Sequence, residues 1–168
     1  YEIRLSLVGS EMCIRDRKFI KSEYAPATQA APSNPGLKAV WHDFKGNKCE
    51  DITKASVKGN YKIENVCIPQ KVSGNIGLVI TGYINVPEDD IYTFALLSDD
   101  GSTLVIDKEK VVDNDGPHGP REVIGQKALA KGYHPIEIRY FDSNGGTLSL
   151  KVLNKQNKEI PFTNLYAH

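Results

Sequence analysis

The chain has 168 residues, of which 40% are hydrophobic, and its 21 basic side chains balance its 21 acidic ones. This length and composition suit one domain with appendages, and a net charge of zero gives no reason to expect a nucleic-acid partner or a membrane-surface partner. No apolar run approaches the roughly 20 residues that a transmembrane helix needs, so we also expect no membrane insertion.

Two N-terminal segments precede the patterned part of the chain. Residues 1–17 follow neither a strand nor a helix period for long, and LSLVGSEMCIRDR resembles translated read-through of a sequencing adapter. We interpret 1–17 as a non-native leader, with a natural unstructured leader as the alternative. Residues 18–36 are rich in Ala, Pro, Ser, Thr and Asn, which predicts an extended linker to an upstream domain. We therefore expect residues 1–35 to add little to stability.

From Gly36 onward, apolar residues alternate with other residues at a period of two. The alternation marks strands in NIGLVITGYINV (75–86), IYTFALL (91–97), STLVID (102–107), YHPIEIRYF (133–141) and TLSLKVL (147–153). Turn residues separate these runs at 87–90, 107–110 and 143–146. Many short alternating strands with such punctuation predict an all-β fold, an antiparallel β-sandwich, over residues 37–168. No segment keeps a 3.6-residue period long enough to predict a helix.

Catalytic signals are few in this sequence. It contains no G-x-S-x-G, no H-E-x-x-H and no phosphate-binding glycine loop. His134 lies in a strand pattern, and we expect it at the surface, whereas His118 lies in the loop DNDGPHGP and is a candidate for lining a site. The adjacent carboxylates Asp99 and Asp100 do not stand about 5–10 Å apart across a cleft, as glycoside hydrolysis requires. We expect no enzyme activity from these residues.

The pair Asp99-Asp100 follows an apolar strand and precedes a glycine. Neighbouring residues on a strand point to opposite faces. A cis peptide bond would shorten the Cα–Cα distance from 3.8 to about 2.9 Å and let both carboxylates converge on one ion. Hard cations such as Ca²⁺ prefer such oxygen ligands. The pattern therefore favours either a calcium site or an acidic Asp-Asp-Gly turn with solvated side chains.

A second acidic run, VVDNDGPHGPRE, imitates the spacing of an EF-hand loop. Val111 stands at its first ligand position and offers no side-chain oxygen. Two prolines and strand-like flanks also replace the helices that an EF-hand needs. We therefore exclude an EF-hand.

Several runs together carry a family resemblance. They are Gly-Tyr-Ile at 82–84, SDDGS at 98–102, VVDNDG at 111–116 and a strand start at 132–134. Over about residues 37–168 the chain resembles the protective-antigen-fourteen domain, named after anthrax protective antigen, which recurs in yeast flocculins and adhesins and in bacterial glycosidases. The resemblance implies a β-sandwich.

The resemblance also implies a metal site. In the lectin members of that family, two consecutive aspartates joined by a cis peptide bond bind Ca²⁺, and the ion binds sugar hydroxyls. They match Asp99 and Asp100 here. A further ligand comes from a late loop that matches DSNGG, for which we choose Asn144 first and Asp142 next.

The neighbouring loops are expected to supply supporting residues. Loops at one end of a sandwich commonly carry function, and we expect 98–102, 113–120 and 142–146 to converge there. Asn114, Asp115 and His118 are then the candidate ligand-binding residues beside the ion. The long sugar-selecting insertions of the adhesins have no counterpart in this compact chain, which leaves the sugar open.

Two hypotheses of function follow from the resemblance. The first is a non-catalytic, calcium-dependent carbohydrate-binding module of a secreted bacterial glycosidase or adhesin, acting as a monomer in an extracellular or periplasmic location. The second is a structural module that packs on an upstream catalytic domain without binding sugar. A linker, then GLKAVWHDFKG, then this module resembles the C-terminal end of bacterial family-twenty glycoside hydrolases, the beta-N-acetylhexosaminidases.

Cysteines and aromatic residues leave two points open. Cys13 lies in the leader, so Cys49 and Cys67 remain as a pair that either forms a bridge, worth roughly 3 kcal/mol in the loop-entropy model, or stays as two free thiols. Protein sugar sites usually offer an aromatic platform. The alternation places most of the candidates in or near the core: Trp41, Tyr83, Tyr133 and Tyr140.

Overall fold

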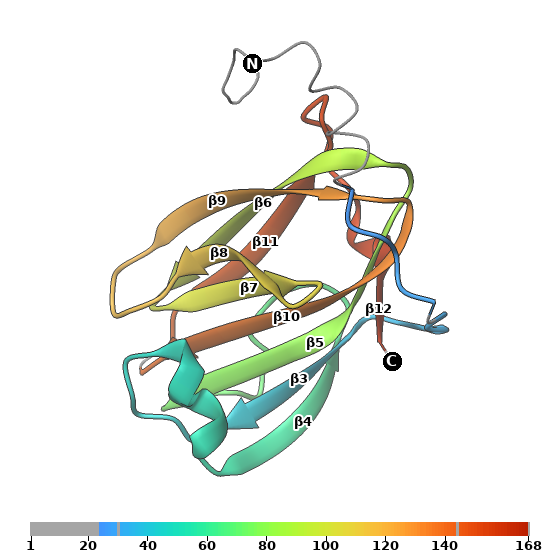
Figure 1. Cartoon of the computed structure of the whole chain (residues 1–168). Coiled ribbons are helices and arrows are strands. Elements are labelled where there is room, and N and C mark those ends of the chain that lie inside the picture. Colours follow the sequence, from blue (N-terminus) through green and yellow to red (C-terminus); the bar gives the residue numbers. More distant parts are fainter. Residues whose placement is uncertain (1–23, 30, 144, 168) are drawn as a thin grey trace.

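The computed structural model describes residues 24–29, 31–143 and 145–167, and it consists of two facing antiparallel β-sheets (Figure 1). Two short 3-10 helices are η2 (Cys49–Lys54) and η3 (Phe162–Asn164). The strands in chain order are β2 (Asn34–Pro35), β3 (Leu37–His42), β4 (Val57–Ile63), β5 (Ile76–Val86), β6 (Asp90–Asp99), β7 (Ser102–Ile106), β8 (Glu109–Asn114), β9 (Arg121–Leu129), β10 (Gly132–Asp142), β11 (Thr147–Leu153) and β12 (Leu165–Ala167). The predicted all-β sandwich is confirmed.

The larger sheet is organised around β5. On one side β10 pairs with β5 along its whole length, and β7 and β8 follow β10 outward. On the other side β5 has two successive partners, because β3 pairs with Gly77–Thr81 and β12 pairs with Tyr83 and Ile84. β4 extends β3, and β2 extends β12. The smaller sheet has the order β11-β6-β9.

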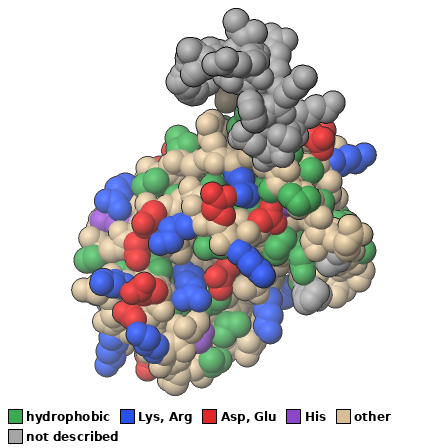
Figure 2. Space-filling view, in the orientation of Figure 1, with side chains coloured by type: hydrophobic (Ala, Val, Ile, Leu, Met, Phe, Trp, Pro, Cys, Tyr) green, Lys and Arg blue, Asp and Glu red, His purple; other side chains and the backbone are tan. Residues whose placement is uncertain are grey.

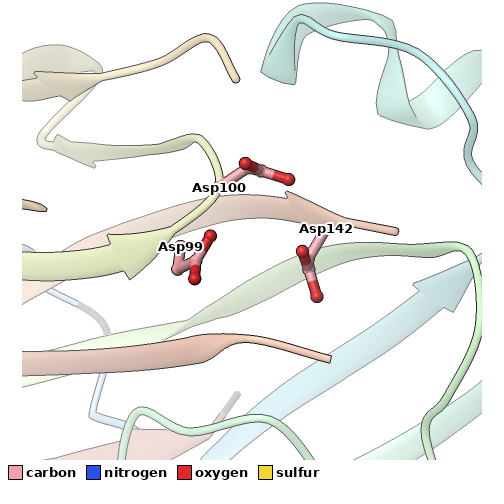
Figure 3. Close-up of side chains that lie close together, drawn as sticks. All are labelled: Asp99, Asp100 and Asp142. Atoms are coloured by element: carbon pink, nitrogen blue, oxygen red, sulfur yellow. The ribbon is translucent and has the colours of Figure 1, made fainter. Parts of the chain in front are cut away.

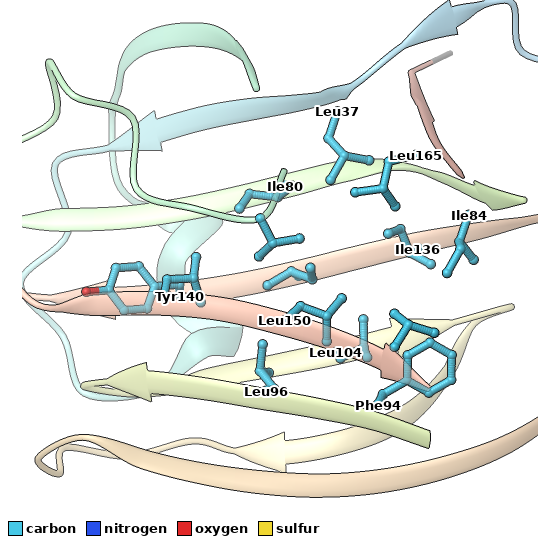
Figure 4. Close-up of a cluster of buried hydrophobic side chains, with 14 of the residues drawn as sticks. Leu37, Ile80, Ile84, Phe94, Leu96, Leu104, Ile136, Tyr140, Leu150 and Leu165 are labelled. Atoms are coloured by element: carbon cyan, nitrogen blue, oxygen red, sulfur yellow. The ribbon is translucent and has the colours of Figure 1, made fainter. Parts of the chain in front are cut away.

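The core fills the space between the two sheets (Figure 4). One face of each strand is apolar, because removing apolar side chains from water is favourable. The period of two determines which residues lie on that face. The alternation predicted these residues, and all are buried: Ile76, Leu78, Ile80, Ile84 and Val86 of β5, Tyr92, Phe94 and Leu96 of β6, Leu104 and Ile106 of β7, Ile136, Ile138 and Tyr140 of β10, and Leu148, Leu150 and Val152 of β11.

A second, smaller cluster lies on the outer face of the larger sheet. Residues of the segment between β3 and β4, including η2, pack there: Phe44, Cys49 and Ile52 cover Val79 and Phe141. The sequence did not predict this cover, because residues 43–56 follow neither a strand nor a helix period. At this end β5 and β10 are therefore buried on both faces.

The N-terminal part of the domain differs from the prediction. The segment expected to be a linker is partly bound to the sandwich: the N–H of Ala25 donates to the carbonyl of Ala128 at 3.0 Å, and the carbonyl of Ala25 accepts from Ala130 at 2.9 Å. β2 then pairs with β12. Ordered contacts thus begin before residue 37. The predicted leader, residues 1–17, lies outside the described residues.

His134 is a second difference. We expected it at the surface, yet its side chain is 0% exposed. Its Nδ1 lies 2.8 Å from Oδ2 of Asp107, and its Nε2 lies 2.7 Å from the carbonyl oxygen of Ala130. The ring is buried because both nitrogens find partners in the turns on either side of it.

The cysteine question is decided by position. Cys49 is buried in the cluster under η2, whereas Cys67 packs against the main core. Both are free. The structure therefore contains two free thiols, and Cys49 and Cys67 form no bridge.

The surface matches the balanced composition. Acidic and basic side chains are interspersed over the face that Figure 2 shows, without a field of one sign. Among the described residues, no helix is long and apolar enough to cross a membrane.

Candidate metal and ligand site

Three aspartates meet where β6 and β10 end (Figure 3). Asp99 ends β6 and Asp100 follows it through a cis peptide bond, while Asp142 ends β10 in the other sheet. One carboxylate oxygen from each of the three lies within 4.8 Å of the others. Asp142 is buried and the other two are partly exposed, so the cluster opens toward solvent on one side.

Hydrogen bonds hold the backbone of the acidic pair. The hydroxyl of Tyr140 donates to the Asp99 carbonyl at 2.7 Å, and Oγ of Ser98 donates to the Asp100 carbonyl at 2.7 Å. The backbone N–H of His118 donates to Oδ1 of Asp100 at 3.1 Å. The pair is thus fixed from β10, from β6 and from the loop between β8 and β9.

Asn114, the last residue of β8, joins the neighbouring ends of β6 and β9 next to the acidic pair. It is 0% exposed, and its amide group lies within 3.2 Å of the Leu96 carbonyl, 3.2 Å of Ser98 Oγ and 2.8 Å of the Arg121 carbonyl. Its own oxygen accepts from Nε of Arg121 at 2.8 Å. A buried amide with every polar atom paired fixes the strand ends around it. Asn114 therefore positions the loop, and its amide atoms are paired with these partners.

Asp115 lies beside the cluster but serves another contact. Its carboxylate accepts from the backbone N–H of Cys49 at 3.0 Å and from that of Gly116 at 2.8 Å. It thereby ties the start of η2 to the loop that carries His118. Burial, and then Asp115, raises the pKa of the Cys49 thiol.

His118 faces its own loop. Its Nε2 lies 2.8 Å from the Asn114 carbonyl and its Nδ1 lies 2.6 Å from the Gly119 carbonyl. The loops 98–102 and 113–120 therefore meet, as expected, through His118 and Asp100. Asn144, the first choice for a ligand from the late loop, lies outside the described residues. Asp142, the second choice, is in the cluster.

The charges of the cluster are close together. Burial and the negative charges of Asp142, Asp99 and Asp100 together raise the pKa of Tyr140. Within the part of the chain that the structure describes, neither Asp99 nor Asp100 forms an ion pair with a lysine or arginine. Carboxylates so placed repel one another unless a cation lies between them. Their oxygens form the donor set that a hard cation such as Ca²⁺ takes, so the residues present fit that ion.

Two glycines that the sequence reasoning did not use allow the close packing. A Cβ at Gly146 would lie 1.9 Å from the Asp99 carbonyl oxygen, and one at Gly101 would lie 2.4 Å from the Phe141 ring. A side chain at Gly146 would displace Asp99, and one at Gly101 would displace Phe141 or Gly116. The signal was present in the runs SDDGS and DSNGG, in which a glycine stands beside each acidic stretch.

The sequence matches the model of the PA14 domain over residues 33–164. The chain belongs to the PA14 domain family. That is the protective-antigen-fourteen family that the sequence motifs resemble, and the matched region begins one residue before β2. A comparison with curated proteins finds no match.

Solved structures share the PA14 fold at low identity. A PA14 sugar-binding domain from an RTX adhesin has a TM-score of 0.68 and 17% identity, over 81% of this chain and 99% of that one. The A domain of epithelial adhesin 6 from Candida glabrata, in complex with Galβ1-3GlcNAc, has a TM-score of 0.60 and 13% identity, over 83% and 89%.

A larger enzyme also contains a similar unit. The beta-glucosidase from Kluyveromyces marxianus, in complex with glucose, has a TM-score of 0.58 and 17% identity, and the similarity covers 79% of this chain but only 17% of the enzyme. A unit of this fold thus forms a small part of a longer enzyme chain.

Proposed function

We propose that this PA14 domain is a non-catalytic module that binds glycans through one Ca²⁺ ion held by Asp99, Asp100 and Asp142, with Asn144 as a further ligand. The observation that carries the proposal is the convergence of three carboxylates within 4.8 Å at one end of the sandwich. Carboxylates from both sheets supply oxygen ligands that no single strand can provide.

The ion, when bound, would supply open coordination positions for the vicinal hydroxyls of a sugar. The chain's own residues prepare that place. Tyr140 and Ser98 fix the backbone of the acidic pair, and the N–H of His118 orients one oxygen of Asp100. A sugar then meets a rigid rim formed by the loops 98–102 and 113–120.

The known structures support a sugar ligand. A PA14 domain of an adhesin is described as sugar-binding, and an adhesin domain of this fold is in complex with a disaccharide. We propose that this chain acts as a monomer in an extracellular or periplasmic location and belongs to a secreted bacterial glycosidase or adhesin, for which a family-twenty hexosaminidase is our candidate.

One observation favours a second function. A unit similar to this chain forms 17% of a beta-glucosidase, which fits a structural module that packs on a catalytic domain of the same protein without binding sugar. The two functions differ in what they require of the acidic cluster. Only the glycan-binding function requires the cluster to bind Ca²⁺ and the ion to contact a sugar.

Calcium binding is tested by thermal unfolding in millimolar CaCl₂ and in EGTA. An ion that binds only the folded chain stabilises it by about 2.7 kcal/mol at a concentration 100 times its Kd. Asp100→Asn should abolish the shift. Glu122→Gln, which removes an exposed carboxylate at the start of β9, at the same end of the sandwich, should keep the calcium-dependent shift. A missing shift in the unmodified protein, or an equal shift in Asp100→Asn, overturns the calcium site.

Glycan binding is tested on a glycan array in calcium and in EGTA, beside an N-acetylhexosaminide hydrolysis assay. We expect binding that EGTA and Asp100→Asn both abolish, and no hydrolysis. A protein that binds calcium but no glycan would favour the structural module. Turnover that disappears on replacing one carboxylate would overturn the non-catalytic proposal.

A further inference from the structure

A groove crosses the outer face of the larger sheet, far from the acidic cluster. It forms where β5 changes its partner from β3 to β12 at Gly82, since the two neighbours leave a notch between them. The cavity has a volume of about 390 Å³ and is lined by Lys38, Thr81, Tyr83, Pro135 and Ala167 among others. This size falls in the range of small-ligand pockets.

One wall of the groove is largely apolar. Thr81 and Tyr83 share a face with Val79, which is covered by η2 on the outer side of the sheet. Pro135 and Tyr166 stand opposite Tyr83 in the neighbouring strands. Tyr83 and Tyr133 were candidates for an aromatic platform, and unlike the buried Tyr140 they are half-buried on this outer face.

The other wall is positively charged. Lys38 of β3 lies directly opposite Lys62 of β4, and both are exposed. Like charges at directly opposed positions destabilise a sheet. Among the residues that the structure describes, neither ammonium group has an ion-pair partner. An adjoining cavity of about 330 Å³ is lined by Lys38, Lys62, Asn34 and Asn60 and shares Ala167 with the first.

Among the described residues, no acidic residue lines either cavity. Glu137 lies opposite Thr81 in the sheet, and its carboxylate is 3.6 Å from Nη2 of Arg139. Glu64 lines a further cavity beside Lys62. The groove thus combines a largely apolar wall, amide groups and two lysines without an ion-pair partner among the described residues. An anionic ligand with a ring that packs on Tyr83 and Pro135 complements all three.

We propose that this groove binds an acidic sugar unit, whose carboxylate or sulfate group pairs with Lys38 and Lys62 while its ring lies against Tyr83. The site is separate from the acidic cluster, because Thr81 lies five residues along β5 from Ile76, the partner of Asp142, or roughly 17 Å at about 3.3 Å per residue. It needs no metal. It therefore does not depend on the calcium proposal.

The test measures binding by calorimetry in EGTA at low ionic strength. The probes are an oligogalacturonate, a sulfated galactan oligosaccharide and a neutral galactan oligosaccharide of the same length. We expect at least one acidic probe to bind about tenfold or more tightly than the neutral one, and binding to weaken with added salt. The stronger of the two acidic probes identifies the carboxylate or the sulfate as the natural group.

Variants separate this groove from general charge attraction. The double variant Lys38→Gln and Lys62→Gln should weaken binding about tenfold, whereas Lys151→Gln, an exposed strand lysine of the smaller sheet, should change it less than about twofold. Asp100→Asn should leave it unchanged, which distinguishes this site from the calcium site. The melting temperature of the double variant shows that it is folded. Absence of binding to both acidic probes, or an equal loss in Lys151→Gln, overturns the proposal.

Discussion

The hydroxyl of Tyr140 donates a hydrogen bond of 2.7 Å to the backbone carbonyl of Asp99. Tyr140 belongs to β10 of the larger sheet and its side chain is 0% exposed, while Asp99 ends β6 of the smaller sheet. The bond therefore joins the two sheets at the end where the carboxylates meet. It couples the core directly to the geometry of the acidic pair.

Removing this hydroxyl should weaken both the fold and the site. Tyr140→Phe keeps the ring but leaves the Asp99 carbonyl without its partner, so we expect the free energy of unfolding to fall by about 1 kcal/mol or more. The stabilisation by calcium should also decrease. Urea unfolding with and without calcium measures both. Tyr166→Phe is the control, because that hydroxyl has no partner among the described residues, and equal effects in the two variants would contradict the prediction.

Gly146 should tolerate no side chain. A Cβ there would lie 1.9 Å from the Asp99 carbonyl oxygen, so Gly146→Ala must move the acidic pair or the late loop. We expect a loss of about 1–3 kcal/mol in stability, as for other overpacked positions, and a loss of the calcium-dependent shift. Gly119→Ala, in the neighbouring loop with open space around it, should be close to neutral. A Gly146→Ala protein with normal calcium binding would show that the site is looser than described.

Stability should depend on pH through His134. Burial lowers the pKa of His134, but its hydrogen bonds to Asp107 and to the Ala130 carbonyl raise it, and the net shift is upward. The stabilising contribution is therefore complete below the unfolded value of about 6.5 and is lost as the pH rises through the higher folded value. Unfolding free energies measured between pH 5.5 and 9 should fall over that window.

A matched variant isolates this contribution. Asp107→Asn removes the carboxylate that holds the imidazolium, and asparagine accepts the positive φ of 51° at this turn position. The decline with rising pH should disappear in this variant. If the decline persists unchanged, it arises from other groups.

Removing the N-terminal segment should cost stability, contrary to what the sequence led us to expect for residues 1–35. A chain that begins at Leu37 lacks the two hydrogen bonds of Ala25 and the pairing of β2 with β12. At about 0.5–1.5 kcal/mol each, the two bonds of Ala25 alone amount to about 2 kcal/mol, and the loss of β2 adds to this. A chain that begins at Ser33 should lose less, and one that begins at Lys18 nothing. Equal stability of all three in urea would show that these contacts add nothing.

The fold was predictable because burial of one face imposes a period of two on each strand. The same rule also predicts that His134 is buried, which we did not infer. His134 shares its parity with the buried Ile136 and Ile138, so the alternation places it inward. Its polar ring suggested the surface instead, since its partner Asp107 lies 27 residues away. A long-range hydrogen bond of that kind leaves no local pattern.

The candidate site was predictable only in part. Asp99 and Asp100 stood out because they are adjacent in sequence, whereas Asp142 joins them through the register of β10 in the sheet. The role of Asp115 depends on Cys49, 66 residues away, in a segment without any period. Sequence spacing identifies groups that one loop brings together, and pairing between distant strands decides the rest.

The pairing of β2 with β12 has a consequence for how this domain can be built into other proteins. Asn34 and Ala167 are direct partners across these two strands, and partners in an antiparallel pair lie about 5 Å apart at their Cα atoms. The unit from Asn34 to Ala167 therefore begins and ends at the same place, although Ala25 upstream is also bound to the sandwich. Such a unit can be spliced into a surface turn of a host with almost no widening of that turn, and the host keeps its own fold on either side.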